Sequence, residues 1–156
     1  MAIRQTTVSQ TYPRFQSLVF PTVTPTLATL TTAGGARTIT PAELLGGLLL
    51  LNVDDAQTAT LPTADLLYAA LASLGVGVGT AFDFDVINTG DTTLTVAVGT
   101  GGTAATGSNS KSTVLTVVAN ASKRFTLIFT AVQAADGSGS NAYRLIGHGS
   151  IAAAVA

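Results

Sequence analysis

The stretch FDFDVINTGDTTLTVAV (82–98) decides the fold class, because it has the pattern of two β-strands joined by a turn. Aromatic or aliphatic and acidic side chains alternate over 82–86, and a period of two is that of a half-buried strand. The run NTGD (88–91) has turn composition, and residues 92–98 are predicted to return as the second strand of a hairpin. This segment therefore predicts an antiparallel β-protein.

Outward from this segment, the same reasoning predicts more short strands. A wholly apolar run at 48–53 predicts a buried strand, with 58–61 as the strand that returns from it. A second hairpin is expected from 113–118 and 123–132, and 142–146 is the last strand. Short strands at this spacing predict a mainly β domain, a small antiparallel β-sandwich or barrel with one short helix.

Two segments carry helix signals. Thr40-Pro41-Ala42-Glu43 has the residues of a capping box with proline at the first helical position, and Gly46-Gly47 is expected to end this helix after about one turn. The longer helix is predicted over 63–74, with Thr63 as its cap and Gly75 at its end. Its buried side is expected to hold the residues at helical spacing, namely Leu66, Leu67, Ala70, Leu71 and Leu74.

Charge and proline divide the chain into unequal parts. The first 42 residues hold four of the five prolines and three arginines, but no acid, whereas all eight acids lie in the remainder. Residues 1–36 are predicted to be an extended arm, 37–150 the β-domain and 151–156 an apolar tail. A disordered tail has few aromatic residues, and this arm has three, so we expect it to dock on another surface. The candidate binding residues are Arg4, Tyr12, Arg14, Phe15, Phe20 and Arg37.

Composition limits the classes of function. Charged residues make up 10% of the chain and the mean hydropathy is +0.49, which predicts an oligomer that buries much of its surface. The absence of cysteine excludes disulfides and thiolate sites, and the sequence predicts a soluble protein made in a reducing compartment. No run is long enough to span a bilayer, so no membrane partner is expected. A net charge of −1 argues against nucleic-acid binding.

Candidate catalytic groups are few, and each has a structural alternative. The single histidine, His148, has no Gly-x-Ser-x-Gly nucleophile motif to serve, and an exposed loop residue is the preferred interpretation. Asp83 and Asp85 lie on one strand face with the spacing of a carboxylate pair, but a second pair would have to face them, so a solvent-facing surface is preferred. Neither feature predicts an enzyme or a small-molecule substrate.

Three further motifs are candidate binding sites. Asp54-Asp55 is either part of a cation site or a turn, and the turn is preferred because no EF-hand spacing accompanies it. The glycines of 75–79 follow a helix, whereas a phosphate-binding loop precedes one. Lys123-Arg124 is either a basic contact for an acidic neighbour or a solvated strand end. No cofactor and no metal site is therefore expected.

The chain resembles a family at the level of several segments. These are ITPAELLGGLLLLNVDDAQTATLPTADLLYAAL (39–71), GTAFDFDVINTGDTTLTVAVGTGG (79–102), NASKRFTLIFTAV (120–132) and AYRLIG (142–147). Together they resemble a small β-module of tailed-bacteriophage virion proteins, notably head decoration (cement) proteins and capsid fibres. The resemblance covers about residues 37–147 and rests on structural motifs.

The resemblance implies a homotrimer on the outer surface of a phage capsid, made in the host cytoplasm and tying together neighbouring copies of the major capsid protein. The arm lies outside the shared module, and its role as the capsid-gripping element is inferred from its composition. The alternative is a head- or tail-fibre module that binds a host surface receptor. The loops at 99–112 and 135–141, where a glycan would be expected to stack, contain no aromatic residue.

Overall fold

The computed structural model describes residues 27–30, 36–53, 55–105, 115–134 and 137–152. Its two helices are α1 (Pro41–Leu45) and α2 (Ala64–Leu71), and α2 continues into the 3-10 turn η1 (Ala72–Leu74). The strands are β1 (Leu27–Leu30), β2 (Ala36–Thr38), β3 (Leu48–Val53), β4 (Gln57–Thr60), β5 (Ala81–Asn88), β6 (Leu94–Ala97), β7 (Gly102–Ala104), β8 (Thr116–Val117), β9 (Ala121–Ala131) and β10 (Ala142–Ala152). The prediction of a mainly β domain is confirmed.

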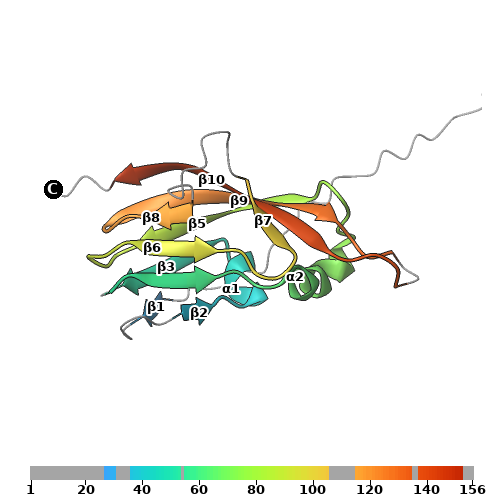
Figure 1. Cartoon of the computed structure of the whole chain (residues 1–156), viewed down its shortest axis with the longest axis horizontal. Coiled ribbons are helices and arrows are strands. Elements are labelled where there is room, and N and C mark those ends of the chain that lie inside the picture. The colour runs from blue at the N-terminus through green and yellow to red at the C-terminus, as the bar shows by residue number, and fades with distance from the viewer. Residues whose placement is uncertain (1–26, 31–35, 54, 106–114, 135–136, 153–156) are drawn as a thin grey trace, which may run out of the picture.

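The strands form two sheets that enclose one apolar core (Figure 1). Sheet A has six strands in the order β1-β3-β5-β9-β10-β7, and sheet B has four in the order β2-β4-β6-β8. Both sheets are mixed. In sheet A the β1/β3, β3/β5 and β7/β10 pairs are parallel, and in sheet B β2/β4 and β4/β6 are parallel. The prediction of an antiparallel sandwich was therefore wrong in strand direction.

The mixed sheets arise because the chain changes sheet at nearly every connection. From β1 to β9, each strand lies in the sheet opposite to that of the strand before it. Three successive coils of two strands stack in this way, so that Leu27, Leu50 and Ile87 are neighbours across β1, β3 and β5. Among the described strands, only β9 and β10 follow each other within one sheet.

Both predicted hairpins were wrong for this reason. β5 pairs with β3 and β9, while the strand after it, β6, belongs to sheet B. The strand predicted to return over 58–61 is β4, which pairs with β2 and β6 and not with β3. Likewise β8 and β9 lie in different sheets. Alternation shows which face of a strand is buried, but it carries no information about which strand lies beside it.

Buried Asn88 holds the crossover from β5 to β6. Its side-chain amide donates to the carbonyl oxygens of Thr92 at 2.7 Å and Val117 at 3.1 Å, and its oxygen accepts from the Gly90 N–H at 3.0 Å. Gly90 itself packs so closely on Val53 that a Cβ there would lie 2.1 Å from the Val53 carbonyl oxygen. The turn thus packs against β3, and β6 does not fold back onto β5.

The predicted helix signals are confirmed. Thr40 and Glu43 form the capping box of α1, Thr63 caps α2, and Gly75 ends η1 in the left-handed region with φ 70°. The buried face of α2 differs from the prediction, because Ala64, Leu67 and Leu71 face the core. Three residues expected on the buried side are exposed instead: Leu66, Ala70 and Leu74. Figure 1 shows α2 beyond the ends of the short sheet B strands.

Part of the segment predicted as an arm belongs to the sheet. Leu27–Leu30 forms β1 at one edge of sheet A, and its backbone pairs in parallel with Leu50–Val53. At the other end of the chain, β10 runs through Ile151 to Ala152, which includes the first two residues of the predicted tail. Residues 1–26, 31–35 and 153–156 of the predicted arm and tail lie outside the described residues.

Candidate functional site

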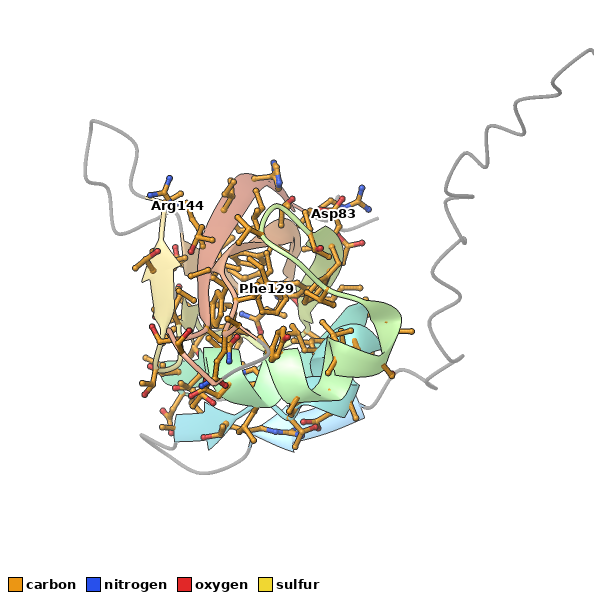
Figure 2. All side chains as sticks on the ribbon, turned by 90° about the vertical axis from the view of Figure 1, so that its right-hand side faces the viewer. Asp83, Phe129 and Arg144 are labelled. Atoms are coloured by element: carbon orange, nitrogen blue, oxygen red, sulfur yellow. The ribbon has the colours of Figure 1, made fainter. Side chains whose placement is uncertain are left out.

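The outer face of sheet A brings together most of the polar groups that the sequence singled out. Alternation along β5 turns Phe84 and Val86 into the core and leaves Asp83 and Asp85 on the outer face. The register of β5 with β9 then places Arg124 opposite Asp85 and Thr126 opposite Asp83. Figure 2 shows Asp83 directed away from the interior, where Phe129 lies.

Arg124 and Asp85 form a two-pronged ion pair across this register. The guanidinium Nε and Nη2 donate to the two carboxylate oxygens, each at 3.0 Å. The hydrogen bond and the charge of Asp85 raise the pKa of Arg124, with a smaller contribution from the charge of Asp83. Because both side chains are largely exposed, water screens the pair, and its main effect is to orient the two groups.

A second polar chain crosses three strands beside this ion pair. The Thr126 hydroxyl donates to the Asp83 carboxylate at 2.5 Å and lies 2.8 Å from Nε2 of His148 on β10. Since the single hydroxyl proton points to the carboxylate, Nε2 of His148 donates to the hydroxyl oxygen. In a catalytic triad the hydroxyl would give its proton to the histidine instead. The arrangement orders the three side chains.

A β-bulge sets the position of His148. The register between β9 and β10 shifts between Gly147 and Ser150, so one extra residue is inserted in β10 at this point. Bulges bend a strand and redirect its side chains. His148 is exposed, as expected, but it lies on a strand and contacts Thr126, so the prediction of a loop residue was wrong.

The ion pair, the bulge and two aliphatic side chains line an open pocket of about 450 Å³. Its wall residues are Leu48, Asp85, Ile87, Ser122, Arg124, His148 and Gly149. An apolar floor beneath a charged rim suits a side chain that has an apolar body and a polar end. In the described part of the chain, no group of three or more His, Cys, Asp or Glu side chains is placed to hold a metal ion.

Lys123 and Arg124, adjacent in sequence, have different environments. Lys123 faces the core, where its ammonium donates to the Thr116 carbonyl oxygen at 3.3 Å and lies 5.7 Å from the centre of the Phe125 ring. Burial lowers the pKa of Lys123. Arg124 points outward to the acid on its own sheet. Both interpretations, a joint basic contact and a solvated strand end, are therefore wrong for Lys123, which is not on the surface.

The remaining predicted site residues fall in two groups. The structure places Arg37 on β2, where its guanidinium contacts the Glu43 carboxylate that also caps α1. The other five lie outside the described residues, so their capsid-binding role stays a prediction: Arg4, Tyr12, Arg14, Phe15 and Phe20. Of the two turn acids, Asp55 is exposed in a bend and Asp54 is outside the described residues.

Two other surfaces were not predicted from the sequence. The outer face of sheet B, as far as the structure describes it, is uncharged and carries a row of aligned side chains from Ala36, Thr58, Thr95 and Thr116. Arg37 lies in register with buried Ala59 and therefore belongs to the opposite face. At the end of the molecule near α2, Leu66, Leu74 and Val78 are 54%, 49% and 68% exposed. Strand register and helix rotation create both surfaces, and neither can be read from local pattern.

Comparison of the chain with protein families, curated proteins and solved structures finds no match at the threshold for significance. No helix within the described ranges is long and apolar enough to cross a membrane. The function must therefore be argued from the surfaces themselves.

Proposed function

We propose that the protein is a structural virion protein, a decoration or cement protein that binds the outer surface of a phage head as a homotrimer. In this proposal the N-terminal arm attaches to the major capsid protein and stabilises its lattice. The observation that supports this proposal is the position of β1. The part of the first 35 residues that the structure describes is paired along the edge of sheet A, next to Leu50–Val53. The segment 1–26 is thus tethered to a fixed strand.

The composition of this segment suits attachment to another protein. It holds Tyr12, Phe15 and Phe20, which have the size of interface anchors, and two arginines without any acid. Extended, 26 residues can reach on the order of 85 Å from β1. The segment can add strands to exposed sheet edges of the capsid, a mode that uses main-chain hydrogen bonds and tolerates a threonine-rich sequence.

Three arms on one trimer explain how weak contacts give firm attachment. Ordering an extended segment costs about 1–2 kcal/mol per residue of backbone entropy, so a single arm binds weakly. After one arm has bound, the other two are held at high effective concentration beside equivalent capsid sites. Since the trimer binds the assembled shell and not the free subunits, binding stabilises the shell.

The test compares full-length protein with a variant that lacks residues 1–26, added to capsids stripped of the protein. This truncation preserves β1 and β2, so the two sheets keep all their strands. We expect the full chain to co-sediment with capsids and to raise their melting temperature, and the truncated chain to do neither. Equal binding by both forms would refute the role of the arm.

Substitutions within the arm test whether its aromatic residues make the contact with the capsid. Replacing Tyr12, Phe15 and Phe20 with alanine is expected to weaken capsid binding strongly. The matched control replaces three nearby threonines with alanine: Thr7, Thr11 and Thr22. If the protein binds host cells and does not bind capsids, this result would favour the fibre alternative and overturn the proposal.

A further inference from the structure

The outer face of sheet A has the composition of an interface. Five aliphatic side chains from four strands lie on it half-buried, although no described segment covers them: Leu48, Leu50, Ile87, Ile128 and Ile146. Leu50 and Ile87 are direct neighbours across β3 and β5. Apolar side chains surrounded by charged ones form the usual plan of a protein–protein contact, with an apolar centre and a polar rim.

The charges on this face are sorted by sign. Asp83 and Asp85 lie on β5, whereas Arg124 and Arg144 lie on β9 and β10. Arg144 is exposed and makes no ion pair with any described residue. In Figure 2 Asp83 and Arg144 lie at opposite sides of the face. β5 is the third strand of sheet A, and Arg124 beside it offsets the charge of Asp85, so the net charges that remain are Asp83 on β5 and Arg144 two strands away on β10. These two charges are complementary between two copies placed side by side.

The outer face of sheet A has a larger area than the other candidate surfaces. Six strands spaced about 4.8 Å apart, with about 3.3 Å per residue along the eight residues of β5, give a face of roughly 600 Å². A stable interface buries about 800 Å² on each partner. The four short strands of sheet B offer only about 200 Å² by the same measure, and one side of α2 about as little.

We infer that copies of this chain associate through the outer face of sheet A, with Asp83 on β5 of one copy against Arg144 on β10 of the next. A contact between two different patches is heterologous, and it closes into a ring when the rotation between successive copies is a whole fraction of a turn. Three copies can therefore meet around one axis, with Arg144 of each directed to Asp83 of its neighbour. The pocket between Leu48 and His148 receives a side chain of the adjacent copy. This inference rests on the proposed homotrimer and specifies its interface.

Charge reversal tests the pairing of Asp83 with Arg144. Sedimentation of the full chain should show a trimer, and Arg144→Asp or Asp83→Arg alone should reduce it to monomer. The double variant carrying both changes restores opposite charges in every contact and should restore the trimer. Asp91→Arg reverses an exposed acid in the turn after β5, off the outer face, and should leave the trimer intact. Circular dichroism checks that each monomeric variant is folded.

Because the chain has no cysteine, a single introduced thiol reports directly on burial. Ser122→Cys lies in the pocket of sheet A, and Thr58→Cys lies on the outer face of sheet B. In the trimer the thiol at 122 should resist maleimide and the thiol at 58 should react, while Arg144→Asp should make both reactive. A trimer with a reactive thiol at 122, or protection that appears only when capsids are added, would overturn the inference and leave the capsid-binding proposal standing. A monomeric wild-type chain that still binds capsids would also overturn it.

Discussion

The side-chain amide of Asn88 donates to the carbonyl oxygen of Val117 at 3.1 Å, and this bond joins the end of sheet A to the last strand of sheet B. The same amide donates to the Thr92 carbonyl oxygen, so one buried side chain satisfies backbone groups in the turn after β5 and in β8. Buried polar groups left without partners are costly, which makes Asn88 a determinant of the fold.

Asn88→Ala should destabilise the protein by roughly 2–4 kcal/mol, since it leaves more than one buried backbone group unpaired. Chemical denaturation monitored by circular dichroism measures the change. Asn52→Ala is the matched control, because Asn52 is half-buried on the outer face of β3, and it should change stability by no more than about 0.5 kcal/mol. Similar losses in the two variants would contradict the role assigned to Asn88.

Gly102→Ala should be among the most damaging small substitutions. An added Cβ would lie 2.5 Å from the Tyr143 ring, which is fully buried and cannot move aside. We expect a loss of about 1–3 kcal/mol, the range for overpacking in a core. Gly77→Ala is the comparison, because nothing lies within 4 Å of its Cβ position. Its stability should be unchanged or slightly raised, as measured by thermal unfolding.

Tyr143→Phe should cost about 1–3 kcal/mol at neutral pH, because the hydroxyl accepts from the Gly99 N–H at 2.9 Å and donates to the Pro62 carbonyl at 3.1 Å. Tyr68→Phe removes a hydroxyl from a half-buried ring and should cost less. Urea titrations of the two variants and the parent protein compare these losses directly.

Alkaline pH gives a second test of Tyr143. Burial raises its pKa more than the hydrogen bond from Gly99 lowers it, so the folded chain holds this proton at higher pH than the unfolded chain. The resulting stabilisation is complete below about pH 10 and is lost as the pH rises through the folded-state pKa. The parent protein should therefore lose more stability between about pH 9 and pH 12 than Tyr143→Phe does. Parallel curves would show that Tyr143 titrates normally.

Leu67→Ala and Leu66→Ala distinguish the two faces of α2. Leu67 is fully buried, and its truncation should cost about 2–5 kcal/mol. Leu66 is 54% exposed, and its truncation should stay within about 0.5 kcal/mol. The sequence pattern predicts equal losses, so denaturation of this pair tests the observed rotation of the helix.

Thr63→Ala should remove the hydrogen bond that the Leu66 N–H donates to the Thr63 hydroxyl and cost about 1 kcal/mol. Thr63→Gly is expected to lose only a few tenths of that, because glycine is itself tolerated at an N-cap. Thermal unfolding of both variants measures the difference, and an equal loss would argue against capping as the cause.

Local signals were reliable where the physics is local. The capping box at Thr40 and Glu43, the strand Leu48–Val53 and the stop at Gly75 were all predicted from neighbouring residues. Strand partners could not be predicted in this way, because the sequences of β5 and β6 have the pattern of a hairpin although the two strands do not pair. The true partner of Asp85 is Arg124, and only the register of β5 with β9 brings them together.

In the candidate site, too, the local features were predicted and the features that depend on strand pairing were not. Asp83 and Asp85 were predicted to share an outward face, and they do. Thr126 and Ser122 were not singled out, although the alternation of β9 places both on that face. The bulge that positions His148 depends on an extra residue between Gly147 and Ser150, which no sequence periodicity reveals.

The alternation of strands between the two sheets has a consequence for how the chain folds. The parallel pairs among β1 to β6 join strands of successive coils, and closing such loops slows folding. Within the described ranges the one pair of consecutive strands that meet directly is β9 with β10, at the C-terminal end. A nascent chain that does not yet include β9 and β10 lacks that pair, so we expect its earlier coils to stay incompletely paired until these two strands have been synthesised.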